Sequence, residues 1–174
     1  MRAKSQRPER QTQGPEPKAS AYVDGLRMLG RRELSEAQVR DRLARKGHEA
    51  DVVEAAVERL RAERAIDDTR VAEAIAHTET AVRRHGRLRV KRRIEQAGIA
   101  PATARGALDA VFSVIDDEAL LQAALDRRLR GRDQIAGEAE FRRMFRYLVG
   151  QGFEPERVIA VLKRRKARSP EPEA

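Results

Sequence analysis

The chain has 174 residues, of which 40% are hydrophobic and only 3% aromatic, with no Trp. Its core must therefore be built from Leu, Ile, Val and Ala, which suits thin helical units better than one large globular core. The 37 Lys and Arg residues outnumber the 28 Asp and Glu residues, and the net charge of +9 favours partners that carry negative charge, nucleic acid or an acidic protein surface first. Because Cys is absent, disulfides are excluded.

No apolar run approaches the roughly 20 residues of a membrane span, and the charged N-terminus lacks the apolar segment of a signal peptide. We therefore expect a cytoplasmic protein with no membrane association. A phosphate-binding loop, a nucleophile elbow and a His-Glu-x-x-His motif are absent from the sequence, so we expect no enzyme activity and no cofactor. The three histidines, His48, His77 and His85, are too scattered for a metal cluster.

Three segments of similar length follow a polar tail. Residues 1–18 are rich in Gln, Pro, Arg and Glu, which predicts a disordered basic tail. Repeat 1 covers residues 19–66, repeat 2 residues 67–115 and repeat 3 residues 116–167, and each is predicted to hold three helices. Residues 168–174 are predicted to form a frayed C-terminal tail.

Repeat 1 shows the local signals most fully. Tyr22, Leu26 and Leu29 recur at helical spacing and predict the first helix. Ser35 can cap the second helix, because its hydroxyl oxygen accepts from a free backbone amide. Gly47 follows this helix, in the place where a glycine with positive φ commonly ends one.

Gly47, Gly98 and Gly152 mark the period of the repeat. The residues eight and four before each glycine, and six, nine and ten after it, are apolar in all three repeats. A fixed period with fixed apolar offsets is the signature of a repeat architecture. These fifteen positions are Val39, Leu43, Val53, Ala56 and Val57, then Val90, Ile94, Ala104, Ala107 and Leu108, then Met144, Leu148, Val158, Val161 and Leu162.

Acidic pairs open the later repeats. Asp67 and Asp68, and 49 residues later Asp116 and Asp117, stand before segments with helical apolar spacing. Acids at a helix start supply a cap and complement the helix dipole, which explains both pairs better than divalent metal binding does. The first of these helices is predicted to contain Val71, Ile75 and Val82.

No segment alternates with period two for long enough to predict a strand. The sequence therefore predicts an all-α fold of three tandem three-helix repeats, each resembling a helix-turn-helix, stacked into an elongated rod.

A strip of basic residues is predicted on the middle helix of each repeat. The positions nine, six and five residues before each turn glycine lie off the apolar face, and six of these nine residues are Arg. The planar guanidinium of Arg binds phosphate and carboxylate groups through paired hydrogen bonds, which the ammonium of Lys does not offer. A solvated charged face is the alternative. The candidate binding residues are Arg42, Arg83, Arg84, Arg87, Arg89, Lys91, Arg92, Arg93, Arg143 and Arg146.

A helix-turn-helix protein places its third helix in the major groove of DNA. The third helix carries Asp51, Glu54 and Glu58 in repeat 1 and Asp109 in repeat 2, and these carboxylates would repel phosphate. We therefore do not expect sequence-specific base reading.

Several stretches resemble one family. Residues 29–47 resemble the first-repeat signature of the bacterial RecX regulatory proteins, and residues 67–72 resemble their acidic-pair motif. Residues 86–99 and the pair 152–153 are similar to their second and third repeats. The resemblance extends over about residues 20–165, with the motifs in the same order.

The resemblance implies a curved rod that is not an enzyme and that modulates the RecA recombinase in DNA repair, homologous recombination and the SOS response. Such proteins bind in the groove of the RecA–DNA filament and typically restrain strand exchange, ATP hydrolysis and co-protease activity. The expected partners are the RecA filament and, without sequence preference, nucleic acid, and the chain is expected to be a monomer. A non-sequence-specific architectural DNA-binding protein and a helical adaptor are the alternatives. The sequence leaves open whether this chain inhibits RecA or also assists it.

Overall fold

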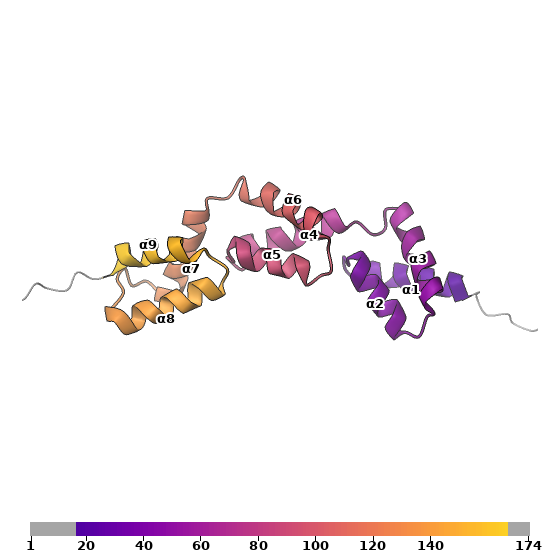
Figure 1. The fold of residues 1–174 in the computed structure, drawn as a ribbon, viewed down its shortest axis with the longest axis horizontal. Coiled ribbons are helices and arrows are strands. Elements are labelled where there is room, and N and C mark those ends of the chain that lie inside the picture. Colours follow the sequence, from indigo (N-terminus) through magenta and orange to yellow (C-terminus); the bar gives the residue numbers. More distant parts are fainter. Residues whose placement is uncertain (1–16, 167–174) are drawn as a thin grey trace, which may run out of the picture. The chain divides into compact units, whose positions relative to one another are not determined.

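The computed structural model describes residues 17–166. This part of the chain contains nine α-helices, one π-helical turn and no strand (Figure 1), so the predicted all-α class with repeated helical units is confirmed. The predicted tails lie outside the described residues, apart from residues 17 and 18, which start the first helix. The elements are α1 (Pro17–Leu29), α2 (Glu36–Arg45), α3 (Ala50–Ala62), α4 (Asp68–His77), η1 (Thr78–Val82), α5 (Arg87–Glu95), α6 (Pro101–Phe112), α7 (Asp117–Leu129), α8 (Gly137–Gly150) and α9 (Pro155–Arg165).

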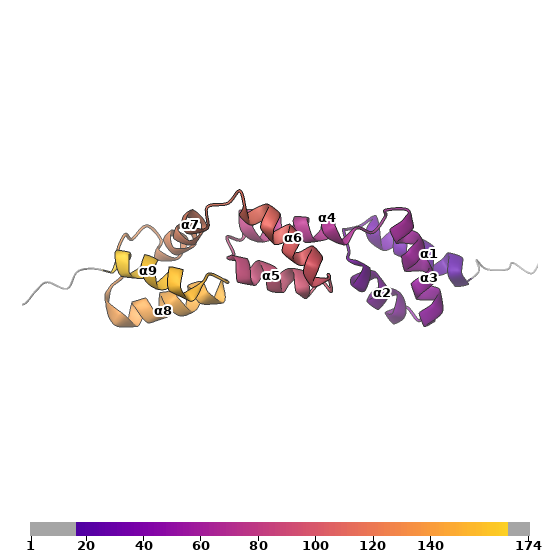
Figure 2. The same cartoon turned by 45° about the horizontal axis from the view of Figure 1, so that its top comes forward.

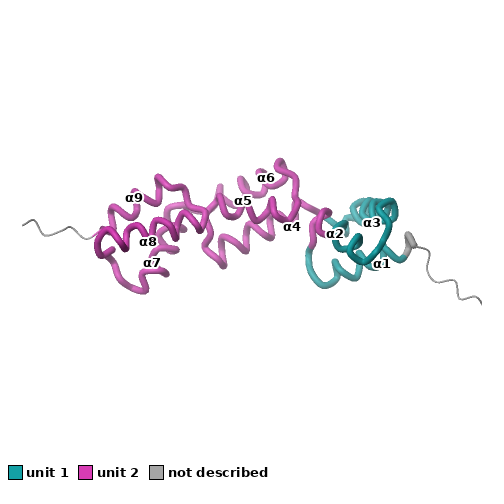
Figure 3. The backbone as a smooth tube through the Cα atoms, turned by 60° about the horizontal axis from the view of Figure 1, so that its bottom comes forward, with its two compact units in different colours: residues 1–33, 39–66 teal, residues 34–38, 67–174 magenta. Residues whose placement is uncertain are grey.

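The chain forms two compact units (Figure 3). Unit 1 contains residues 39–66 and the segment up to residue 33, and unit 2 contains residues 34–38 and the chain from residue 67 onward. The first turn of α2 therefore belongs to unit 2 and the rest of that helix to unit 1. The limits of the three predicted repeats and their stacking into a rod stay predictions.

In unit 1, α1 packs against α3 through its smallest residues. Ala21 and Gly25 are buried, and a methyl group added at Gly25 would lie 2.6 Å from Leu60 Cδ1. Leu26, one of the three residues whose spacing predicted this helix, is exposed. The spacing therefore predicted the helix correctly, and the close approach of α1 to α3 places small residues rather than Leu26 at their contact.

In unit 2, α4 packs against α5 and α6 around a core that includes Val90, Ile94 and Leu108. After His77 the chain makes the π-helical turn η1, whose backbone hydrogen bonds span five residues. This turn shifts the helical register, so Glu79 and Thr80 are buried and Val82 is 68% exposed. Val82, which the sequence predicted in one helix with Val71 and Ile75, therefore lies in the π-helical turn that follows α4.

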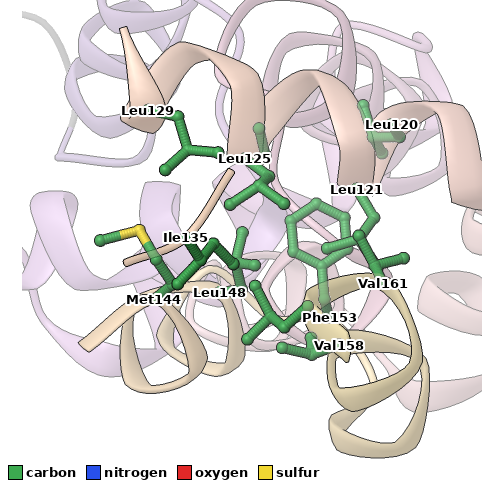
Figure 4. Close-up of a cluster of buried hydrophobic side chains, with 12 residues drawn as sticks. Leu120, Leu121, Leu125, Leu129, Ile135, Met144, Leu148, Phe153, Val158 and Val161 are labelled. Atoms are coloured by element: carbon green, nitrogen blue, oxygen red, sulfur yellow. The ribbon is translucent and has the colours of Figure 1, made fainter. Parts of the chain in front are cut away.

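The helices α7, α8 and α9 surround the second hydrophobic cluster of unit 2, and α8 lies beside α9 in both views (Figures 1 and 2). Figure 4 shows Leu125 and Leu129 of α7 converging on Met144 and Leu148 of α8. Ile135, which precedes α8 in a loop, is also fully buried, and its amide donates to the Arg165 carbonyl at 2.8 Å.

The fifteen apolar positions around the turn glycines are all buried. Each of the three turn glycines has a positive φ: +89° at Gly47, +75° at Gly98 and +90° at Gly152. The turn at Gly152 also reaches α5, because the Leu88 amide donates to the Gly152 carbonyl at 3.1 Å. The helices α5 and α8 are thereby fixed to one another through backbone atoms.

The residues expected at helix starts make both local and distant contacts. Asp67 caps α4 by accepting from the Arg70 amide at 3.0 Å, and the Asp116 side chain accepts from two amides of α7. Ser35 accepts from the Gln38 amide at 3.2 Å and donates to the Ala97 carbonyl. Asp68 accepts from the Glu36 amide at 2.9 Å, so it caps α2 from a distant part of the sequence.

Candidate nucleic-acid interface

Helix α5 presents the densest group of predicted binding residues. Val90 and Ile94 are fully buried and fix the orientation of the helix. Arg89, Arg92 and Arg93 lie on the exposed side. Two apolar residues four positions apart therefore set which face of α5 is buried, and most of its other positions are basic.

The structure separates the cations that already have a partner from those that do not. Arg83 pairs with Glu79 at 2.9 Å, Lys91 with Glu95 at 3.7 Å and Arg143 with Glu140 at 3.0 Å. Arg87 pairs with Asp109 and lies over the Phe112 ring. Arg89 donates to the Gly150 carbonyl at 2.9 Å. The Arg93 guanidinium is 4.0 Å from Glu79, at the outer limit of an ion pair.

Four predicted residues have side chains that make no hydrogen bond or ion pair with any residue in the described range 17–166. Their positive charge is therefore available to a partner. They are Arg42, Arg84, Arg92 and Arg146.

A surface depression of about 340 Å³ lies beside α5, and we call it the α5 depression. Four Arg side chains and one Glu side chain line it, so the wall carries a formal surplus of positive charge. The cations are Arg83, Arg89, Arg92 and Arg93, and the acid is Glu79.

Glu79 was not among the predicted residues. It is only 4% exposed; its Oε2 atom lies 2.5 Å from His85 Nδ1, and its Oε1 atom accepts from Arg83. The carboxylate therefore holds Arg83 in place at the depression. Arg92 is the lining cation whose side chain has no partner in the described part of the chain. Only the π-helical turn brings Glu79 into this position, and a regular helical period does not predict such a turn.

The six remaining candidates do not line the α5 depression. Arg42 belongs to unit 1, and the other five belong to unit 2: Arg84, Arg87, Lys91, Arg143 and Arg146. The continuous strip along stacked repeats therefore stays a prediction.

The sequence is similar to known regulatory proteins. The family model of the first three-helix domain of RecX matches residues 21–60. Regulatory protein RecX of Syntrophotalea carbinolica is 33% identical over 138 residues, which are 79% of this chain and 90% of that protein. The chain belongs to the RecX family. Regulatory protein RecX of Acidithiobacillus ferrooxidans is 34% identical over 139 residues, which are 79% of this chain and 85% of that protein.

Solved RecX structures have the same fold. The crystal structure of RecX from Lactobacillus salivarius aligns with a TM-score of 0.67 at 18% identity, over 86% of this chain and 96% of that chain. A second crystal structure of regulatory protein RecX aligns with a TM-score of 0.69 at 22% identity, over 86% of this chain and 72% of that chain. The RecX relatives carry the name of regulatory proteins rather than enzymes, which is consistent with the expected absence of enzyme activity.

Within residues 17–166 of this RecX family member, no helix has the length and apolar composition needed to cross a bilayer. The same range contains no group of three or more His, Cys, Asp or Glu residues placed to hold a metal ion.

Glu140 holds one of the predicted binding residues of this RecX chain in place. Its buried carboxylate accepts from Arg132 at 2.6 Å, from the Ala136 amide at 2.8 Å and from Arg143 at 3.0 Å. Arg143 is therefore partly neutralised, and Glu140 positions the start of α8 through the Ala136 amide.

The same contacts predict a pH dependence. The hydrogen bond from Arg132, followed by that from the Ala136 amide, lowers the pKa of Glu140 to about 2. The pKa of Glu in an unfolded chain is about 4.3, so the unfolded chain binds the proton first as the pH falls. The stability that charged Glu140 contributes is therefore lost between about pH 4.3 and about pH 2. Glu140→Gln should lower the melting temperature at neutral pH, and its difference from wild type should narrow through this window. Glu73→Gln, at an exposed position of α4, is the control and should follow the wild-type curve. A constant difference for Glu140→Gln across the window would contradict the assignment.

Proposed function

We propose that the chain binds the RecA nucleoprotein filament and modulates, typically inhibits, its recombinase, ATPase and co-protease activities in DNA repair and the SOS response. The observation that carries the proposal is the α5 depression in a member of the RecX family: four guanidinium groups around one buried carboxylate. A filament of protein on DNA offers both carboxylate and phosphate groups, and the planar Arg fork suits both.

The test uses the arginines of the α5 depression that have the weakest contacts within the described chain. Arg89 is unsuitable because it donates to the Gly150 carbonyl, and Arg83 because it lies 2.9 Å from buried Glu79, whereas Arg93 is 4.0 Å from that carboxylate. We therefore choose the double variant Arg92→Ala and Arg93→Ala. The matched control, Arg105→Ala and Arg127→Ala, removes two exposed cations of unit 2 that do not line the α5 depression.

The measurement is DNA-stimulated ATP hydrolysis by RecA at increasing concentrations of the protein. The double variant should need about ten times the wild-type concentration for half of the effect, which corresponds to about 1.4 kcal/mol. The control should stay within about twofold of wild type, since surface substitutions usually have small effects. Equal potency of the double variant and the control would refute a role for the α5 depression. The sign of the wild-type effect also shows whether this chain inhibits RecA or assists it.

The alternative is a protein that coats DNA without contacting RecA. The surplus of Lys and Arg over Asp and Glu in the sequence favours it, because non-specific DNA binding is largely electrostatic. The two functions differ in stoichiometry and specificity. A filament modulator should act at amounts well below one molecule per RecA protomer and should spare an unrelated DNA-dependent ATPase. If the wild-type chain inhibits both ATPases equally, the coating function replaces the filament function.

A further inference from the structure

Unit 1 contains a second basic depression, of about 450 Å³, between the end of α1 and the helix α2. We call it the α1–α2 depression. Among the predicted binding residues, only Arg42 lies in it. Its charged walls are formed by one carboxylate, Asp24, and five cations: Arg27, Arg31, Arg32, Arg42 and Lys46.

Asp24 engages only some of these cations. Its side chain is 14% exposed and lies 2.9 Å from Lys46, 3.6 Å from Arg27 and 3.0 Å from His48. The hydrogen bond from Lys46, followed by that from His48, holds the pKa of Asp24 below its usual value, so the carboxylate stays charged at neutral pH. The side chains of Arg31, Arg32 and Arg42 make no hydrogen bond or ion pair with any other residue in the described part of the chain.

Helix capping does not account for this much positive charge. Helices α1 and α2 both end near the depression, at Leu29 and Arg45, and each C-terminus carries about half a negative charge. Together with Asp24 these ends offset about two of the five cations, which leaves a surplus of about three positive charges. Like charges held close together destabilise a fold unless a partner neutralises them.

We propose that the α1–α2 depression binds the phosphodiester backbone of nucleic acid, at a site separate from the α5 depression. Four of its five cations are Arg, the side chain best suited to phosphate. Arg42 and Lys46 are four residues apart, about 6 Å along the direction of α2, which is close to the separation of neighbouring phosphates on a strand.

The rest of the lining distinguishes nucleic acid from an acidic protein. Met28 is the only large apolar residue that lines the depression, and no aromatic side chain does. A protein partner gains most of its affinity from apolar and aromatic anchors in pockets, which this surface does not offer. Contact with phosphates needs only cations, and it gives affinity without sequence preference.

The test compares two triple variants of the full chain. The depression variant carries Arg31→Gln, Arg32→Gln and Arg42→Gln, and removes the three cations that have no described partner. The control variant carries Arg45→Gln, Arg61→Gln and Arg64→Gln, and removes three exposed charges from the same unit outside the depression. Because the net charge is equal, any difference between the variants reports the position of the charge.

The measurement is fluorescence anisotropy of a labelled single-stranded oligothymidylate of about 20 nucleotides, titrated over a range of salt concentrations without RecA. The depression variant should bind at least about tenfold more weakly than the control at about 0.1 M salt. Its plot of log affinity against log salt should be flatter than that of wild type by about 2, since each lost phosphate contact contributes about 0.7 on a single strand. Without RecA in the assay, the outcome does not depend on the proposed filament function.

A smaller variant guards against effects on folding. Arg31→Gln with Arg32→Gln changes only exposed residues between α1 and α2, and it should flatten the salt dependence by about 1.4. The proposal is overturned if the depression variant binds oligothymidylate like the control. It is also overturned if wild type binds a polyglutamate peptide of equal charge as tightly as oligothymidylate and the depression variant loses both, because the site would then take acidic protein segments.

Discussion

Gly152→Ala is expected to lower the free energy of unfolding by about 3 kcal/mol or more, whereas Gly47→Ala should cost only about 1 kcal/mol. The two glycines have nearly the same backbone conformation, with φ of +90° and +89°. A methyl group at Gly47 would meet no atom within 4 Å, so this variant measures the backbone cost alone. At Gly152 the methyl group would overlap the backbone nitrogen and Cβ of Arg89 and lie 2.8 Å from its Cα.

The overlap at Gly152 cannot be relieved by rotating a side chain, because the atoms involved belong to the first turn of α5. Relief requires α5 to move away from the turn, which would lengthen the bond from the Leu88 amide to the Gly152 carbonyl. In a chain of this size 1 kcal/mol corresponds to about 2–4 °C, so thermal unfolding followed by circular dichroism should show a loss of about 3 °C for Gly47→Ala and about 10 °C for Gly152→Ala. Equal losses would mean that the contact between α5 and this turn adds nothing to stability.

Leu125→Ala should be similarly damaging, at about 3–4 kcal/mol. Leu125 is fully buried in the cluster formed by α7, α8 and α9, where Leu129, Met144 and Leu148 surround it (Figure 4). The substitution removes apolar contacts and leaves a cavity that these helices can fill only in part.

The control for Leu125→Ala is Val114→Ala. Val114 is 84% exposed, and its truncation should change the free energy of unfolding by less than about 0.5 kcal/mol. Urea unfolding of both variants measures the difference. A loss below about 1 kcal/mol for Leu125→Ala would show that this cluster is loosely packed.

The part of the fold that repeats could be predicted from the sequence. The offsets around the three turn glycines identified fifteen buried residues, because helix geometry and a tight turn constrain every repeat in the same way. The exceptions occur where the chain departs from a regular helix. The π-helical turn exposes Val82. Ile135 is buried although it lies in a loop, where no hydrophobic periodicity indicates which residues face the core.

The binding residues could be predicted only as a group. The sequence identified a basic middle helix but not which of its cations are available, because that depends on partners distant in the sequence. Arg89 bonds to the Gly150 carbonyl, while the side chain of Arg92, three residues later, has no partner in the described part of the chain. The sequence did not predict the α1–α2 depression for the same reason, since residues of α1, of the loop after it and of α2 and its C-terminal end form it together.

The division of α2 between the two compact units affects how such a protein can change during evolution. Residues 34–38 belong to unit 2, although residues of unit 1 precede and follow them, so the polypeptide passes between the units three times rather than once. A deletion of residues 19–66 would remove the Ser35 hydroxyl from the Ala97 carbonyl and the Glu36 amide from Asp68. The first repeat is therefore not a detachable module. Its loss would also require substitutions in the second repeat that replace these two hydrogen bonds.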